Sequence, residues 1–390
     1  MNVAVDGMLL NRLCTGVETV ILNLARSLFE TGRFNYTLFV SQKIPYTDWN
    51  SSRFKTVAVS GPVYIKLFRI LYQQTLLPLK LSKGQYDLFH ATGYTAPLRI
   101  KIPFVVSVYD LIALDYPELC PLRNRLHFRM FLPATIRRAT GIIVPSEQTR
   151  MDIERRFQFV TSKIRVIKPG VSAIFHPEPE PLKMEQTKQH YGIPSRYILF
   201  VGRLEAKKNL ECLINAFHLL KSHNRIPHKL LLIGSRGYRA GSIFRRIQLL
   251  GLNSEVIVRE GVVETDLPLL YKGADLFVFP SFYEGFGLPV LEAMACGTAV
   301  VISKHGALPE TAGGSAFVVE PLSPQTLAEG IEKVLTDNQL RRTLVEKGLN
   351  HAKSFTWTSY AQRVEQFYEE CLEQTKGCRK KYDKHCVCDG

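Results

Sequence analysis

The sequence predicts an α/β protein made of two doubly wound domains, each a parallel sheet covered by helices. The chain has 390 residues, a length that suggests two domains. In both halves short apolar runs alternate with segments of helical periodicity, which is the pattern of βαβ units. Between the halves, residues 173–194 are rich in proline and charge (HPEPEPLK), and this composition predicts a linker.

The first domain is expected over residues 1–172. Residues 2–6 have the character of a strand, residues 19–28 repeat apolar side chains at helical spacing, and residues 36–40 form a second apolar run. Further strands are predicted over 87–90, 104–108, 141–144 and 164–167. A strand, a helix and a strand in this order predict a parallel sheet.

The second domain is expected over residues 195–355. Strands are predicted over 197–201, 229–233, 256–258, 276–279 and 299–302, and helices over 210–220, 267–272, 326–335 and 340–351. A last helix is predicted over 356–375, and the basic tail 376–390 is expected to be disordered. The tail carries Cys378, His385, Cys386 and Cys388, whose spacing fits no standard zinc pattern, so no metal site is predicted.

The composition excludes several classes of protein. Hydrophobic residues make up 46% of the chain and charged residues 22%, which is ordinary for a globular enzyme. The start MNVAVDG has no secretory signal pattern, and no apolar stretch is long enough to span a membrane. The eight cysteines are scattered, as in Cys14, Cys212 and Cys296, and suggest buried thiols. We therefore expect a cytoplasmic protein, either soluble or peripheral on the inner face of the cell membrane.

The positive charge is concentrated in the first half. The formal net charge is +15, and residues 1–172 hold 23 Lys and Arg against 11 Asp and Glu, a net charge of +12. Residues 64–83 and 123–138 interleave bulky apolar and basic residues, which is typical of a helix on an anionic membrane surface and also of an ordinary solvent-exposed helix. No nucleic-acid-binding motif is present, so no nucleic-acid partner is expected.

One strand–loop–helix unit, residues 279–298, has the strongest pattern in the chain. A buried strand precedes it, and a helix begins at Gly287, Leu288 and Pro289. The free N–H groups of such a helix favour an anion. Glu284 and Glu292 would repel a phosphate, so they more plausibly bind neutral sugar hydroxyls. Two acids at this spacing also occur by chance, and that alternative remains open.

A second loop of the same half carries two cations. Arg203 and Lys208 follow Gly202 after a predicted strand and precede a predicted helix. A planar guanidinium and a mobile ammonium are suited to holding a diphosphate and to stabilising its charge without a metal.

Polar groups also follow strands of the first half. His90 ends one predicted strand, and Tyr109 and Asp110 come directly after another, where open α/β sheets place ligands. Gly16 precedes a helix and could let the backbone approach a phosphate or a sugar. Each of these residues could equally have an ordinary structural role.

Taken together, these residues resemble the retaining glycosyltransferases with two Rossmann-like domains (the GT-B architecture) and the E-x7-E motif, known as family 4 or group 1. The resemblance rests on GRLEAKKN at 202–209, on GADLFVFPSFYEGFGLPVLEAMACGTAVV at 273–301 and on GALPE at 306–310. Residues 6–28 look like the opening of bacterial surface-polysaccharide enzymes, mannosyltransferases among them.

The resemblance implies two domains facing each other across a cleft, with the last helix returning to the first domain. It implies transfer of a hexose, such as mannose, from a GDP- or UDP-linked sugar, with no cofactor and no metal. The acceptor would be lipid-linked or a saccharide and would bind to the basic first domain. A nucleotide-sugar donor would contact Gly16, Gly202, Arg203, Lys208, Val263, Glu284, Gly285, Phe286, Gly287, Leu288 and Glu292.

Catalytic roles are implied for Glu284, Arg203, Lys208, Asp110 and Tyr109. One departure from the family pattern matters, because His-Asp is usual where this chain has Tyr109-Asp110. A tyrosine is bulkier and cannot be cationic. An inactive relative that acts as a scaffold or binds a partner at the membrane is therefore the alternative hypothesis.

Overall fold

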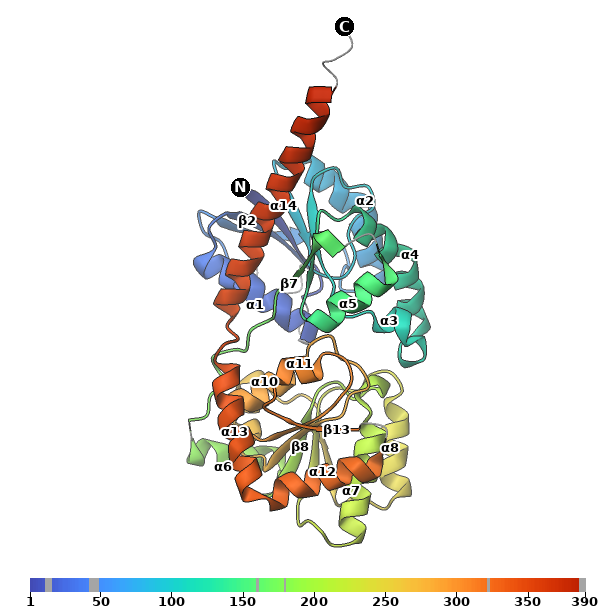
Figure 1. The fold of residues 1–390 in the computed structure, drawn as a ribbon, viewed down its shortest axis with the longest axis vertical. Helices are drawn as coiled ribbons and strands as arrows, with labels where there is room; N and C mark the ends of the chain where they lie inside the picture. The colour runs from blue at the N-terminus through green and yellow to red at the C-terminus, as the bar shows by residue number, and fades with distance from the viewer. Residues whose placement is uncertain (11–15, 42–48, 159–160, 179, 321–322, 386–390) are drawn as a thin grey trace. The chain divides into compact units, whose positions relative to one another are not determined.

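The computed structural model describes residues 1–10, 16–41, 49–158, 161–178, 180–320 and 323–385, with the side chains of 376–385 left out. The chain divides into two compact units. Unit 1 contains Met1–Asp115, Leu122–Gly170 and the chain from Trp357 onward, and unit 2 contains Tyr116–Pro121 and Val171–Thr356. Figure 1 shows the elements of both.

Unit 1 is built on a parallel sheet whose strand order is β3-β2-β1-β4-β5-β6-β7 in the described residues. The strands are β1 (Asn2–Gly7), β2 (Asn35–Ser41), β3 (Phe54–Val59), β4 (Leu88–Ala91), β5 (Phe104–Ser107), β6 (Gly141–Val144) and β7 (Ile164–Val166). The helices are α1 (Gly16–Thr31), α2 (Lys66–Lys83), α3 (Ile112–Asp115), α4 (Leu122–Arg138), α5 (Glu147–Arg156) and α14 (Trp357–His385). The chain order reverses between β1 and β4, so the carboxyl ends of these two strands form a topological switch point.

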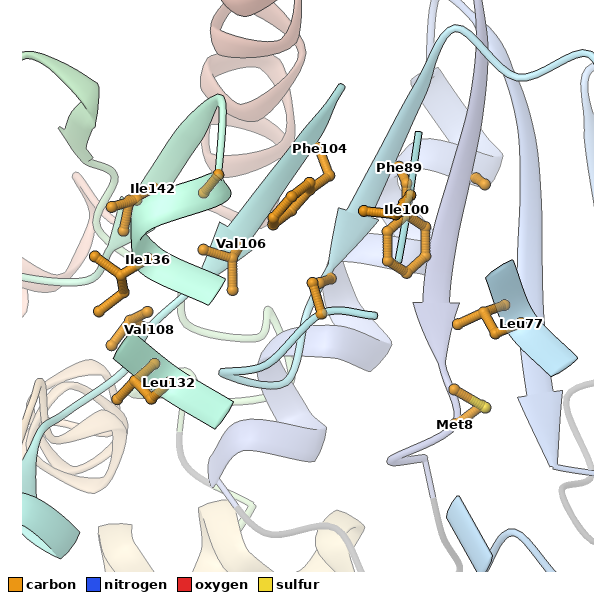
Figure 2. Close-up of a cluster of buried hydrophobic side chains, with 14 of the residues drawn as sticks. Met8, Leu77, Phe89, Ile100, Phe104, Val106, Val108, Leu132, Ile136 and Ile142 are labelled. Atoms are coloured by element: carbon orange, nitrogen blue, oxygen red, sulfur yellow. The ribbon is translucent and has the colours of Figure 1, made fainter. Parts of the chain in front are cut away.

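The core of unit 1 lies between the sheet and α2, α4 and α5. Figure 2 shows part of it, where Leu132 and Ile136 of α4 lie near Val106 of β5. These side chains are buried, as four-residue strands that are apolar throughout require when helices cover the sheet. On the other side of the sheet α14 packs against α1 and β6 (Figure 1).

Unit 2 repeats this architecture with the strand order β10-β9-β8-β11-β12-β13 in its described part. The strands are β8 (Tyr197–Val201), β9 (Lys229–Ile233), β10 (Val256–Arg259), β11 (Leu276–Phe279), β12 (Val300–Ser303) and β13 (Phe317–Val319). The helices are α6 (Pro181–Tyr191), α7 (Leu210–Ser222), α8 (Ala240–Leu249), α9 (Leu267–Lys272), α10 (Leu288–Ala295), α11 (Leu308–Ala312), α12 (Pro324–Thr336) and α13 (Asn338–Ala352). Its switch point lies between β8 and β11.

Two doubly wound parallel sheets confirm the predicted fold class. The prediction was wrong within the linker, because residues 173–194 contain α6, which packs against α9. The expected disorder was also wrong for the start of the tail, since α14 continues to His385, while residues 386–390 lie outside the described chain. The sequence analysis does not predict β3, α5, α8 or β13.

Candidate functional site

The loops that follow β8 and β11 meet at the switch point of unit 2, because these strands are neighbours in the sheet. The first loop, 202–209, ends in a short 3-10 helix over Ala206–Lys208, after which α7 begins. The second loop, 280–287, leads into α10. A backbone hydrogen bond of 2.9 Å from Phe282 N to Lys207 O joins the two loops. The topology therefore brings both predicted motifs to one edge of the sheet.

Lys208 and Glu284 form an ion pair across these loops. Lys208 Nζ lies 2.6 Å from Glu284 Oε1, and the two residues are 7% and 8% exposed. The ammonium also lies 4.7 Å from the centre of the Phe279 ring, within range of a cation–π interaction. The sequence analysis predicts both charged residues, and it misses Phe279 as the aromatic support of Lys208.

The two loops supply more positive than negative charge around this pair. Burial by itself would raise the pKa of Glu284, but Lys208 and Lys207 beside it hold that pKa below its usual value. Burial lowers the pKa of Lys208, and Glu284 opposes this shift. The carboxylate is therefore ionised at neutral pH. Lys207, whose Nζ lies 3.8 Å from Glu205 Oε1, is a cation of the site that the sequence analysis does not identify.

Arg203 lies on the same loop as Lys208 and differs from it in environment. Its side chain is exposed, and it forms no ion pair or side-chain hydrogen bond with any residue that the structure describes. Its backbone is fixed by its neighbours, since Gly202 N donates to Ile233 O at 2.9 Å and Leu204 N donates to Ser235 O at 2.9 Å. The loop is held in place while the guanidinium stays available for a ligand.

Glu292 lies on α10 and is bonded to a tyrosine of α9. Tyr271 donates a hydrogen bond of 2.8 Å from its hydroxyl to Glu292 Oε2. Burial raises the pKa of Glu292 to about 7; the bond from Tyr271 lowers this pKa and the charge of Glu264 raises it further. Tyr271 is fully buried, so it positions Glu292 from the core side. Sequence patterns do not reveal this partner, because 21 positions separate the two residues.

The loop from Glu284 to Leu288 has a tightly fixed backbone. Gly287, with φ of 108°, caps α10 in the left-handed conformation, and Pro289 occupies the first turn as predicted. Ala307 N donates to Glu284 O at 2.9 Å, and Thr311 Oγ1 donates to Phe286 O at 2.6 Å. The GALPE segment and Thr311, which follows it, thus support the loop that carries the first acid.

Gly306 of that segment lies directly against Glu284. Its φ is 62°, and a Cβ atom there would lie 2.7 Å from Glu284 O and 2.8 Å from Glu284 N. Only glycine fits without displacing the loop. Gly285 lies in the same loop, between Glu284 and Phe286.

Val263 lies apart from this group, after β10. Its side chain is exposed, and its backbone N–H points to the hydroxyl of Tyr191 on α6, at 3.4 Å. Tyr191 in turn donates to Asp266 at 2.9 Å. Through Tyr191, the helix α6, found in place of the predicted linker, therefore helps to fix the backbone around Val263.

In unit 1, Tyr109 and Asp110 follow β5 as predicted. The Tyr109 ring packs edge-on against Tyr94, with 5.4 Å between the centroids. Burial and the nearby Tyr360 raise the pKa of Tyr109, while a hydrogen bond with Ser107 opposes the shift. Asp110 accepts hydrogen bonds of 3.2 Å from the Tyr94 hydroxyl and from Ile112 N. Gly16 is exposed as the first residue of α1.

His90 is a structural residue of unit 1. It is fully buried, with Nδ1 2.6 Å from the Tyr368 hydroxyl of α14 and Nε2 2.8 Å from Ser107 Oγ. Burial lowers its pKa to about 3, so the imidazole is neutral at pH 7. Of the two roles left open for His90, the structural one is correct.

The structure also bears on metal sites and membrane spans. Across the described side chains, no three His, Cys, Asp or Glu residues gather in a way that could hold a metal ion. Cys14, Cys386 and Cys388 lie outside the described residues. No helix in the described ranges combines the length and the apolar character needed to cross a bilayer.

Each half of the chain matches a family model of glycosyltransferases. The family model described as glycosyl transferases group 1 matches residues 183–351, and the model of glycosyltransferase family 4 matches residues 14–173. The O-antigen chain mannosyltransferase B of Escherichia coli is 28% identical over 362 residues, which cover 91% of each chain.

Solved structures share the fold. Sucrose-phosphate synthase from Thermosynechococcus elongatus has a TM-score of 0.74 at 22% identity, with 96% of this chain and 99% of that chain covered. HepE of Anabaena, in complex with UDP and glucose, has a TM-score of 0.73 at 20% identity, with 95% and 100% covered.

Proposed function

Since the chain belongs to the group 1, family 4 glycosyltransferases, we propose that it moves a hexose from a nucleoside-diphosphate sugar to a lipid-linked or saccharide acceptor. The observation that carries this proposal is the buried Lys208–Glu284 pair at the switch point of unit 2, with Arg203 unpaired among the described residues of the same loop. Mannose from a GDP-linked donor is our first choice, because a relative that matches 91% of the chain is a mannosyltransferase. UDP-linked glucose is the second.

In this proposal Arg203 and Lys208 hold the donor diphosphate. The bond between the anomeric carbon and the diphosphate oxygen breaks, and its electron pair stays with the diphosphate. The acceptor hydroxyl oxygen bonds to the anomeric carbon on the same face, and its proton passes to the departing diphosphate. The two cations stabilise the charge that develops on the leaving group, which is the largest contribution that a fixed site can make.

The acids bind the neutral parts of the donor. Glu284 is held ionised and can accept hydrogen bonds from sugar hydroxyls. The backbone N–H groups from Gly285 to Leu288 are proposed to donate to the same sugar. Glu292 is proposed to accept from the ribose hydroxyls. Tyr109 and Asp110 would line the acceptor side in unit 1.

We also propose that unit 1 contacts an anionic membrane surface. Large apolar side chains on α2 and α4 are exposed in two rows, namely Leu67, Phe68, Leu71, Leu76 and Leu79 on α2 and Leu122, Leu126 and Met130 on α4. Exposed cations flank them, namely Lys80, Lys83, Arg123 and Arg129. Apolar rows beside cations favour a bilayer with acidic headgroups over a purely apolar partner.

The test of transfer uses purified full-length chain with GDP-mannose, UDP-glucose, ADP-glucose and dTDP-glucose, each with membrane extract. Release of the nucleoside diphosphate is measured against Arg203→Ala. Thermal shifts with GDP, UDP, ADP and dTDP identify the base. Nucleotide release from one donor that Arg203→Ala abolishes supports the proposal. Absence of both release and nucleotide binding would instead favour the scaffold.

A further inference from the structure

Three cations and a histidine gather in unit 1, and none of them is among the predicted site residues. Lys66 and Arg69 lie on α2 and Arg123 and His127 on α4, and Lys66 Nζ donates a 2.6 Å hydrogen bond to Asn124 Oδ1 that joins the two helices (Figure 1). The spacing of three residues on α2 and four on α4 places each pair on one face of its helix. We refer to these four residues as the α2–α4 cationic cluster.

The cluster is only partly neutralised by acids. Burial and the charges of Arg69 and Arg123 lower the pKa of Lys66 to about 8, and no carboxylate acts on it. His127 has a pKa lowered to about 4 by burial and by Lys66 and Arg69. Asp6 and Glu18 do act on Arg69, but neither is close enough to form an ion pair with it in the described chain. Gathering like charges costs stability, so the fold maintains this cluster against a free-energy cost.

Two groups of the cluster have donors or acceptors to spare. Arg69 is half-buried, and its guanidinium makes no hydrogen bond to any side chain or backbone group in the described ranges. His127 Nδ1 is buried without a hydrogen-bond partner, although the ring packs on Phe128 and Phe131. Buried polar atoms in native proteins nearly always have partners. A ligand with several acceptor oxygens and negative charge would satisfy both groups.

The surroundings connect the cluster to the carboxyl edge of the unit 1 sheet. Asp6 is the penultimate residue of β1, and Gln73 Nε2 of α2 lies 3.5 Å from its Oδ2 and donates at 2.7 Å to Thr95 O. Gln73 extends the row of Lys66 and Arg69 on α2 by one turn. The cluster therefore lies next to the position that a ligand at the switch point of this sheet would occupy.

From these observations we infer that the α2–α4 cationic cluster binds a phosphate group carried by the acceptor. The inference rests on the proposed function, and it specifies the acceptor as a phosphate ester or diphosphate. The adjacent apolar rows on α2 and α4 favour a phosphate attached to a lipid chain. A soluble phosphorylated saccharide would offer the same charged group, and the experiment separates these two sources.

The experiment measures binding of octyl phosphate, inorganic phosphate and octyl glucoside to the full chain by calorimetry at low salt. A saturating nucleoside diphosphate occupies the donor site throughout. The variants Lys66→Gln and Arg69→Gln remove one charge each while keeping a polar side chain of similar length. Arg26→Gln on α1 and Lys55→Gln on β3 remove the same charge from exposed positions and serve as controls.

We expect Lys66→Gln and Arg69→Gln to weaken octyl phosphate binding by about tenfold or more, because each loses a charge-assisted hydrogen bond. The controls should change it by no more than about twofold, as exposed charges do. Octyl phosphate binding more tightly than inorganic phosphate assigns the site to a lipid phosphate, and equal affinities assign it to a soluble one. Unchanged affinity in both cluster variants overturns the inference.

Nucleoside diphosphate affinity, measured in the same variants, separates the two proposals. Loss of phosphate binding with unchanged nucleotide affinity supports the cluster. If neither the wild-type chain nor any variant binds a nucleotide, the proposed transfer fails. The octyl phosphate titrations then still show whether the cluster binds phosphate.

Discussion

Lys208 Nζ lies 2.6 Å from Glu284 Oε1 at the junction of two loops, and hardly any of either side chain reaches solvent. Removing one partner of such a pair leaves the other charge buried alone. We expect Lys208→Met to lower the free energy of unfolding by about 3 kcal/mol. The double variant Lys208→Met with Glu284→Gln should recover most of that loss, because no uncompensated charge remains.

Urea unfolding of the wild type, both single variants and the double variant measures this coupling. Transfer activity should stay absent in the double variant despite its recovered stability, since the diphosphate has lost its buried cation. A double variant that unfolds as easily as Lys208→Met would show that the pair is held by something other than charge.

The protonation of Glu292 gives a pH dependence with a definite sign. Its pKa is raised from 4.5 to about 7, so the folded chain binds this proton more tightly than the unfolded chain. The contribution of Glu292 to stability is complete below pH 4.5 and is lost as the pH rises through 7. Glu292→Gln should therefore flatten the fall in unfolding free energy between pH 5 and pH 8, measured by urea titration at each pH. If the unfolding free energies of the variant and the wild type fell equally with pH, the raised pKa of Glu292 would be contradicted.

Tyr109 stands where the resemblance noted in the sequence leads us to expect a histidine. Its hydroxyl is bonded to Ser107, and its ring is packed on Tyr94. We expect Tyr109→Phe to cost about 1 kcal/mol of stability, the net worth of one buried hydrogen bond. The kcat should stay within about threefold, because the hydroxyl is already engaged inside unit 1. A drop in kcat without a change in stability would instead assign the hydroxyl to the reaction.

Substitution of Gly306 tests the support of the loop that carries Glu284. In Gly306→Ala the added methyl group meets the Glu284 backbone at 2.7 Å in a left-handed conformation. We expect a loss of about 1–3 kcal/mol in stability together with weaker donor binding, seen by thermal shift with and without nucleotide. Gly61→Ala, whose φ of 97° is also positive but whose Cβ would meet nothing within 4 Å, is the matched control for backbone strain.

The apolar rows on α2 and α4 predict sedimentation with vesicles. Leu67→Ser and Leu126→Ser should each reduce binding to vesicles that contain anionic lipid, because each removes an exposed apolar side chain. Their melting temperatures should change little, because neither leucine is part of the buried core. Equal binding of the variants and the wild type would assign the rows to another partner.

The loops of the proposed donor site could be predicted from the sequence because their signals are local. β8 and β11 are continuous apolar runs, as buried parallel strands require, and Pro289 and Gly287 mark the start of α10. The aromatic partners of Glu292 and Lys208 were not predictable. Tyr271 and Phe279 contact Glu292 and Lys208 only once the chain has folded, and neither has a distinguishing local pattern.

The helix α6 escapes sequence analysis for a compositional reason. Its flanks are rich in proline and charge, and only Thr187 and Lys188 of its residues are buried, so the apolar stripe of a helix is missing. Two signals were present nonetheless, since Pro181 opens the helix and Gly192, with φ of 59°, closes it. Tertiary packing against α9 compensates for the weak pattern.

The position of α14 has a consequence for biosynthesis. Glu365, buried in unit 1, accepts hydrogen bonds from the Tyr36 hydroxyl and from Arg33 N, and Tyr368 bonds with His90. The helix that follows unit 2 in the chain thus completes the domain that precedes unit 2. On the ribosome, unit 2 can finish folding while unit 1 still exposes the surface that α14 will cover. Emergence of α14, rather than emergence of the amino-terminal half, is then the step at which the first domain closes, and until that step unit 1 exposes apolar surface that can aggregate.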